Sequence, residues 1–129
     1  MIQGIIKKML VTHSDSRGYF MEILKDDDKL LRHFGQVSIS LTKPGVIKAF
    51  HWHRHQDDLF YVIQGTTQVV LYDLRTNSRT FKQIMTFRMS DKNPNIVFIP
   101  KKVAHGYKVL GKKPLIMLYI MNKSYNNKK

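Results

Sequence analysis

The sequence predicts an all-β domain, a sandwich, jelly roll or barrel with at most one short helix. Short segments in which apolar and polar residues alternate follow one another from residue 18 to residue 121. Alternation with a period of two is typical of strands that bury one face. Turn residues such as Lys43-Pro44-Gly45 and Gln64-Gly65 separate these segments. Many short strands at such regular spacing favour a sandwich or barrel.

Each element follows from its local pattern. The segments expected to form strands are residues 18–24, 36–41, 46–50, 59–63, 67–72, 79–85, 96–99, 106–110 and 115–121. Residues 26–34 are the helical candidate, because three aspartates precede apolar residues and acids suit the start of a helix. Asp73 and Arg75, at a strand end, are expected to form an exposed ion pair. No repeat or linker divides the chain, so we expect one domain over residues 1–129 with a polar, basic tail at about 122–129.

The composition limits the function classes. Hydrophobic residues make up 43% of the 129-residue chain, which is enough for a packed core and too much for a disordered chain. The absence of cysteine excludes a disulfide scaffold, a thiolate nucleophile and a cysteine-ligated metal.

The formal net charge of +13 does not indicate nucleic acid. The basic residues occur singly and in pairs, and no nucleic-acid-binding module is visible. No apolar run approaches the ~20 residues of a membrane helix, and the first residues lack the apolar stretch of a signal peptide. We therefore expect a cytoplasmic protein without a nucleic-acid or membrane partner.

Histidines and an aspartate form two spaced motifs. Residues 45–65 follow the pattern Gly–x5–His–x–His–x4–Asp–x6–Gly, and residues 100–105 follow Pro–x4–His. The chemistry-bearing residues of these motifs are His51, His53, Asp58 and His105. Together the two motifs closely resemble the paired motifs of the cupin superfamily. This resemblance implies a cupin-type double-stranded β-helix, which is a jelly-roll barrel.

A narrower resemblance extends over most of the chain. Six motifs occur in order: D-x-R-G-x-F-x-E at 15–22, F-x-Q-x-S-x-S at 34–40, G-V-x-K-A-F-H-x-H at 45–53, D-L-R-x-x-S-x-T-F at 73–81, I-P-x-x-x-A-H-G-Y at 99–107 and Y-x5-Y at 119–125. They resemble the dTDP-4-dehydrorhamnose 3,5-epimerase family. The family pattern has Asn at Ser38, Arg at Lys48 and Phe at Tyr107.

The resemblance implies chemistry on a nucleotide-linked 4-keto-6-deoxysugar without a metal or organic cofactor. The ketone acidifies the neighbouring C–H groups, so the enzyme needs a base and a proton donor. His51 matches the base of the family, and a neutral imidazole, with an ordinary pKa of ~6.5, can accept a proton at pH 7. Tyr119 or Tyr125 would donate a proton on the opposite face of the sugar, and the resemblance favours Tyr119.

The same resemblance implies the substrate contacts. Arg17 would bind the diphosphate through its guanidinium fork, and Lys48 would add a point charge there. The further contacts expected are Phe20, Glu22, Gln36, Asp58 and His105. Phe20 and Glu22 would be contributed across a homodimer through strand exchange.

Two departures from the family pattern concern the base and the enolate. Asp58 stands where the family has the lysine that supports the enolate. The sequence also ends before the family segment with the aspartate that orients the base, and we expect Asp57, Asp58 or His53 to take over that duty. The chain is also similar to the compact dTDP-sugar 3,4-ketoisomerases, in which His51 with His53 would move one proton through an enediol.

Two other function classes stay open at the level of sequence. In a metal-dependent cupin, one divalent transition metal would be held by His51, His53, Asp58 and His105. In a non-catalytic cupin, the same barrel would bind a sugar without turnover.

Overall fold

Short strands make up nearly all the regular structure of residues 1–125, which are the part of the chain described by this computed structural model. The strands are β1 (Ile6–Met9), β2 (Thr12–Asp15), β3 (Gly18–Met21), β4 (Gln36–Thr42), β5 (Ile47–His51), β6 (Asp58–Gln64), β7 (Thr66–Asp73), β8 (Ile84–Ser90), β9 (Asn95–Ile99), β10 (Val103–Leu110) and β11 (Leu115–Met121). A 3-10 turn, η1 (Asp26–Asp28), is the only helical element in this range. The all-β prediction is confirmed.

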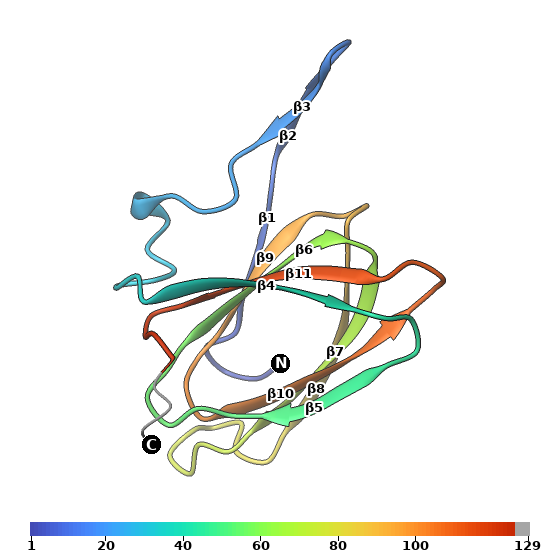
Figure 1. Cartoon of the computed structure of the whole chain (residues 1–129). Helices are drawn as coiled ribbons and strands as arrows, with labels where there is room; N and C mark the ends of the chain where they lie inside the picture. Colours follow the sequence, from blue (N-terminus) through green and yellow to red (C-terminus); the bar gives the residue numbers. More distant parts are fainter. Residues whose placement is uncertain (126–129) are drawn as a thin grey trace.

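Two antiparallel sheets face each other and enclose the core (Figure 1). One sheet has the strand order β1-β9-β6-β11-β4, and the other has the order β5-β10-β7-β8. Strands distant in the sequence are therefore neighbours, as in a jelly roll. The β2–β3 hairpin forms a separate ribbon that projects away from the barrel (Figure 1).

The period-two alternation explains how the barrel forms its core. Along β7 the inward residues Thr67, Val69, Leu71 and Asp73 are buried, and the residues between them are partly exposed. Burying one Val, Leu or Phe side chain stabilises the fold by about 1.5–3 kcal/mol. β6 and β10 are buried almost throughout, so these central strands position whatever side chains they carry with little freedom.

The predicted helix over residues 26–34 is wrong beyond its first turn. Lys29 adopts a left-handed conformation, with φ of 58°, which ends η1 after Asp28. Leu30 instead packs with Leu59 and Ile120 on the outer face of the five-stranded sheet. Apolar burial on a preformed sheet therefore replaces the amphipathic helix that the local pattern favours.

The predicted strand over residues 79–85 begins later than expected, at Ile84, because the preceding loop is held by Asp73. The carboxylate of Asp73 accepts hydrogen bonds from Arg75, Ser78 and Thr80, at 2.9 Å, 2.7 Å and 2.6 Å. Burial alone raises the pKa of this carboxyl, but these hydrogen bonds lower it well below its usual range. The expected exposed ion pair is thus a buried network, and the prediction of exposure is wrong.

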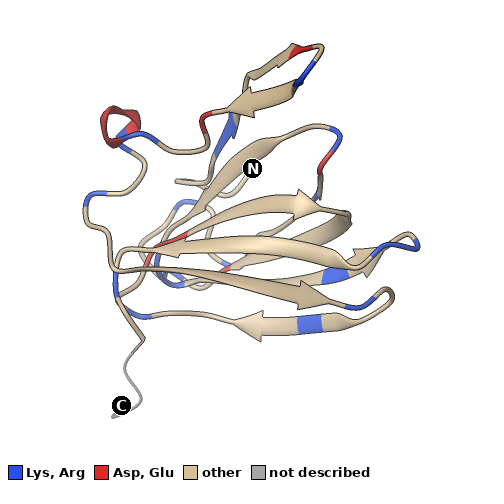
Figure 2. Ribbon diagram, turned by 45° about the horizontal axis from the view of Figure 1, so that its top comes forward, with Lys and Arg blue, Asp and Glu red and all other residues tan. Residues whose placement is uncertain are grey.

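Lysine and arginine are distributed over loops, strand ends and outward faces without forming a continuous stripe (Figure 2). No helix in the described part of the chain is long and apolar enough to cross a membrane. Of the tail expected at 122–129, residues 126–129 lie outside the described residues.

Replacing Asp73 with asparagine should destabilise the barrel, because Arg75 then loses its carboxylate partner. We expect the free energy of unfolding at pH 7, measured in urea, to fall by about 3 kcal/mol, as when one partner of a buried ion pair is removed. Asp26→Asn, the same change at an exposed position of η1, is the matched control and should alter it by less than about 0.5 kcal/mol. Equal effects of the two substitutions would contradict this role of Asp73.

Candidate active site

An open cavity of about 420 Å³ lies between the two sheets, and most of the predicted site residues line it. These residues are Gln36, Lys48, His51, His53, Asp58, His105, Tyr119 and Tyr125. They come from β4, β5, β6, β10 and β11 and from the segments that follow β5 and β11. Positions more than 80 residues apart in the sequence are thus brought to one space by the strand order.

The pairing of β5 with β10 places two of the histidines side by side. His51 is the register partner of His105, and the register shifts between His105 and Tyr107. At this point a Cβ on Gly106 would lie 2.8 Å from the Cβ of Ala49, which is closer than two side chains can approach. A glycine at 106 therefore allows β5 to lie against β10.

Successive side chains continue to point to opposite sides of the chain past the end of β5. His51 and His53 line the cavity, and the residues next to them, Trp52 and Arg54, line a separate hollow on the other side. His51 is exposed at the open edge of the cavity, whereas His105 lies deep inside it. The His51 imidazole is therefore accessible to a molecule that enters the cavity from solvent.

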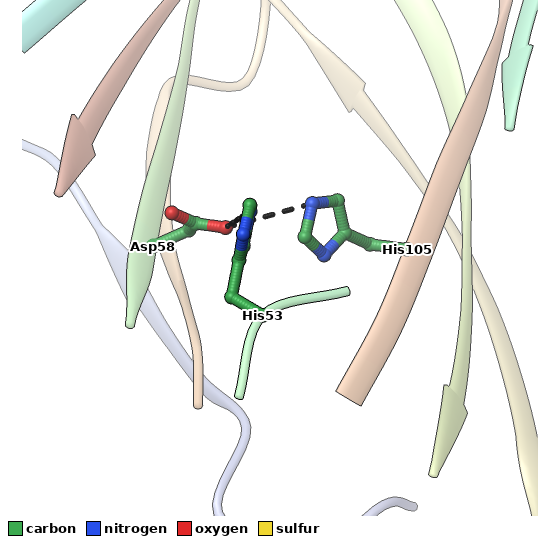
Figure 3. Close-up of side chains that lie close together, drawn as sticks. All are labelled: His53, Asp58 and His105. Carbon is green, nitrogen blue, oxygen red and sulfur yellow. Dashed lines mark ion pairs between the residues drawn. The ribbon is translucent and has the colours of Figure 1, made fainter. Parts of the chain in front are cut away.

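Asp58 contacts two histidines through one carboxylate oxygen (Figure 3). Its Oδ2 is 3.4 Å from Nε2 of His53 and 3.5 Å from Nε2 of His105, and its Oδ1 accepts a 2.8 Å hydrogen bond from Gln56. Burial raises the pKa of Asp58 to about 6, against the opposing effect of Gln56. The carboxyl therefore gains and loses its proton near neutrality, unlike an exposed aspartate.

His105 is held in its neutral form. Burial lowers its pKa to about 4, although the contact with the Val103 carbonyl acts in the opposite direction. Nδ1 of His105 lies 3.3 Å from that carbonyl oxygen, so we assign the proton of the neutral ring to Nδ1. The lone pair on Nε2 then faces Asp58, and this arrangement favours a proton or a cation between them.

Tyr119 projects into the cavity from the sheet opposite His51. Its hydroxyl is 2.7 Å from Oγ of Ser40 and 2.7 Å from the hydroxyl of Tyr107. The ring of Phe60 contacts both Tyr119 and His105 edge-on, with ring centroids 5.4 Å and 5.3 Å apart. Burial raises the pKa of Tyr119 above its usual range, so the phenol keeps its proton at neutral pH.

Ser40 and Tyr107 were not among the residues predicted for the site. Both share a strand face with a predicted site residue, since Ser40 lies four positions after Gln36 and Tyr107 two after His105. Extending the period-two rule along each strand would have found them.

The structure places Arg17, Phe20 and Glu22 away from the cavity within one chain. Arg17 lies on the β2–β3 hairpin, where it binds the carboxylate of Asp15 at 2.6 Å. Phe20, on the same hairpin, is exposed, and Glu22 follows β3 at a separate hollow. Their expected role at the substrate stays a prediction that requires a second copy of the chain.

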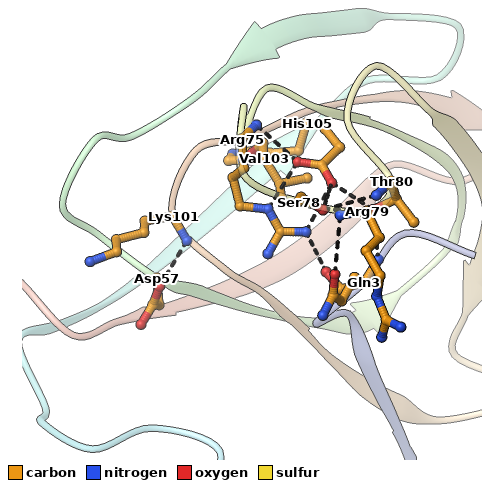
Figure 4. A network of polar contacts seen from close by, with 10 residues as sticks. Gln3, Asp57, Arg75, Ser78, Arg79, Thr80, Lys101, Val103 and His105 are labelled. Carbon is orange, nitrogen blue, oxygen red and sulfur yellow. Dashed lines mark hydrogen bonds and ion pairs between the residues drawn. The ribbon is translucent and has the colours of Figure 1, made fainter.

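Of the three residues expected to orient the base, Asp57 has another structural role. Its Oδ1 accepts a 2.8 Å hydrogen bond from the backbone N–H of Lys101 (Figure 4). Asn122 forms hydrogen bonds with both the backbone and the side chain of Asp57. Asp57 therefore joins three segments at the barrel end, which leaves His53 and Asp58 as the candidates.

Three of the four residues predicted as metal ligands lie close together. The potential ligand atoms of His53, Asp58 and His105 all lie within 4.8 Å of one another. His51 is not part of this group in the described range. Two imidazoles and a carboxylate suit a divalent transition metal, so these residues fit such an ion chemically.

Comparison with known proteins identifies the family. The model of the family described as dTDP-4-dehydrorhamnose 3,5-epimerase matches residues 1–129. The chain belongs to this family. Its members are nucleotide-sugar epimerases of the isomerase class, and the predicted cupin-type fold is confirmed.

Three relatives illustrate the similarity. The spore coat polysaccharide biosynthesis protein SpsL of Bacillus subtilis is 52% identical over 126 residues, which are 98% of this chain and 83% of that protein. The dTDP-4-dehydrorhamnose 3,5-epimerase of Methanothermobacter thermautotrophicus is 36% identical over 104 residues, 76% of this chain and 56% of that enzyme. The crystal structure of RmlC from Legionella pneumophila in complex with dTDP-4-keto-L-rhamnose has a TM-score of 0.89 at 25% identity and covers 100% of this chain and 72% of that one.

An Asp58→Asn variant should gain stability relative to wild type as the pH rises. The pKa of Asp58 is about 6 in the folded protein, against an ordinary value of 3.8. In the wild type the protonated carboxyl therefore stabilises the fold fully only well below pH 3.8. This contribution to the unfolding free energy is lost as the pH rises through 6. Asparagine has no proton to lose. The difference in unfolding free energy should therefore shift in favour of the variant by about 2.4 kcal/mol between pH 4 and pH 7.5 in chemical unfolding.

The control for this series is Asn93→Ser, which changes an exposed turn residue without a titratable group. Its difference from wild type should be the same at both pH values. A pH-independent difference for Asp58→Asn would contradict the account of a buried carboxyl.

Proposed function

We propose that this protein epimerises a dTDP-linked 4-keto-6-deoxysugar, with His51 as the base and Tyr119 as the proton donor. The observation that supports this proposal is the placement of the two side chains. His51 lies on β5 of one sheet and Tyr119 on β11 of the other, and both line the same cavity. A sugar ring between them would meet a base on one face and an acid on the other, which is what inversion requires.

The reaction needs only proton transfers. His51 accepts the proton from the carbon next to the ketone, and the electron pair of that C–H bond moves into the enolate. The O–H bond of Tyr119 then breaks as a new C–H bond forms on the opposite face, and the ketone is restored. General acid–base catalysis of this kind contributes about 10² to 10⁴ in rate.

The substrate's diphosphate needs a cation, and one is available at the cavity. Lys48 is the only Lys or Arg that lines the cavity within residues 1–125. We propose that it contacts the diphosphate, together with Arg17 from a second copy of the chain. The dTDP-sugar bound by the Legionella relative supports this choice of substrate class.

In a homodimer, the projecting hairpin of one chain could reach the cavity of the other chain. Outward apolar side chains on the edge strand β4, Val37, Ile39 and Leu41, are 51%, 64% and 58% exposed in the single chain. Such a patch is typical of an interface. We propose that a second copy covers it and receives Arg17, Phe20 and Glu22 of the hairpin region, and that this cytoplasmic dimer is the working enzyme.

Solvent exchange tests the assignment of the base. In D₂O, dTDP-4-keto-6-deoxyglucose should acquire deuterium at C3, C5 or both, and NMR should show the inverted product. His51→Asn should slow both processes by about 10² to 10⁴ because the base is lost. His33→Asn, a histidine exposed outside the cavity, is the matched control and should behave as wild type.

The structure of the product in this experiment also distinguishes an epimerase from a ketoisomerase. Inverted stereochemistry with the ketone still at C4 identifies an epimerase, and a ketone moved to C3 identifies the ketoisomerase reaction, in which His51 and His53 shuttle the proton. If wild type incorporates no deuterium into any nucleotide 4-keto sugar that it binds, the proposed chemistry is wrong and a sugar-binding role remains.

A metal cupin is the second candidate, favoured by the convergence of His53, Asp58 and His105. Elemental analysis of untagged protein decides between the two. The metal-free proposal predicts far less than one transition-metal ion per chain and unchanged turnover after chelation. Stoichiometric metal that is lost in His105→Ala, together with lost turnover, would overturn it.

A further inference from the structure

Four hydroxyl groups form a continuous row in the cavity wall next to Tyr119. The Tyr119 hydroxyl is 2.7 Å from Ser40 on one side and 2.7 Å from Tyr107 on the other, and the Tyr107 hydroxyl is 3.4 Å from Oγ1 of Thr42. Ser40 and Thr42 lie on β4, and the two tyrosines lie on β10 and β11. The row therefore joins both sheets.

The number of hydrogens and lone pairs on each hydroxyl determines which group donates and which accepts along this row. A phenol has one hydrogen to donate and two lone pairs that accept. If Tyr119 gives its hydrogen to the sugar, it must act as acceptor in both 2.7 Å contacts, so Ser40 and Tyr107 are the donors. Tyr107 can in turn accept the hydrogen of Thr42. Only this direction leaves the hydrogen of Tyr119 free for the cavity.

We infer that Tyr107 is a positioning residue for proton donation by Tyr119. Its hydroxyl directs the hydrogen of Tyr119 toward the sugar and stabilises the phenolate that remains after the transfer. This inference rests on the proposed function. The Tyr107 side chain is only 6% exposed, within the main apolar cluster, where an unsatisfied hydroxyl would destabilise the fold.

The proton balance of the donating step closes without any further reactant. The O–H bond of Tyr119 breaks and a C–H bond forms at the sugar carbon, using the electron pair of the enolate. The phenolate accepts hydrogen bonds from Tyr107 and Ser40 until it takes a proton from water. His51 releases the proton that it abstracted, also to water.

Tyr107→Phe tests the inference because it keeps the ring and removes only the hydroxyl. Formation of the inverted product should slow on the order of tenfold to a hundredfold in kcat, the effect of losing one hydrogen bond to a charged group. KM should change little, since Tyr107 is not assigned a substrate contact. Deuterium exchange should fall less, because His51 can return a solvent-derived deuteron to the same face. The ratio of exchange to inversion should therefore rise.

Two further variants make the result specific. Ser40→Ala removes the other donor and should raise the same ratio, which keeps the inference testable if Tyr107→Phe folds poorly. Tyr72→Phe makes the identical change on the face of β7 that points away from the buried core residues, and it should leave the ratio unchanged. An unchanged ratio in both Tyr107→Phe and Ser40→Ala would overturn the inference, whether or not overall activity falls.

A spectroscopic readout separates failure of this inference from failure of the proposed function. In tyrosine-labelled protein, the ¹³Cζ resonance of Tyr119 should move in Tyr107→Phe and stay in place in Tyr72→Phe. Absence of turnover in wild type would refute the proposed function. An unmoved Tyr119 resonance in Tyr107→Phe would overturn the hydroxyl row itself.

Discussion

The close approach of β5 to β10 at Gly106 is the constraint on which the site depends. A side chain at this position would collide with Ala49, and β5, an edge strand in the described part of the chain, would then move away from β10. His51 lies opposite His105 only because the two strands pair here. His53 follows two residues later and reaches Asp58 on β6. One missing Cβ thus allows His51, His53 and Asp58 to meet around one cavity.

Burial then determines the charge state of the groups inside. It raises the pKa of Asp58 and Tyr119 and lowers that of His105, so each is shifted toward its neutral form. At pH 7 His105 and Tyr119 are therefore neutral, whereas Asp58, with a pKa of about 6, gains and loses its proton close to that pH. The net charge of the chain, by contrast, resides mostly outside the cavity, and Lys48 is the one Lys or Arg lining it within residues 1–125.

Local patterns predicted most strands and most cavity residues, because inward positions of a barrel strand repeat every second residue. They did not predict the late start of β8. The loop before β8 is held by hydrogen bonds from Arg75 and Ser78 to the buried carboxylate of Asp73, at the end of β7. Residues 26–34 do not form the predicted helix, because packing of Leu30 on the sheet outweighs the local helix propensity. The structure of one chain does not test the predicted contact of Arg17 with the substrate, because Arg17 lies on the projecting hairpin outside the cavity.

The most direct measurement is a crystal structure of the protein with an unreactive 4-hydroxy analogue of the dTDP-sugar. The account predicts the sugar ring between His51 and Tyr119, with one side chain on each face and the Tyr119 hydroxyl still in contact with Tyr107 and Ser40. A sugar bound outside this cavity, or one with His51 and Tyr119 on the same face, would contradict it.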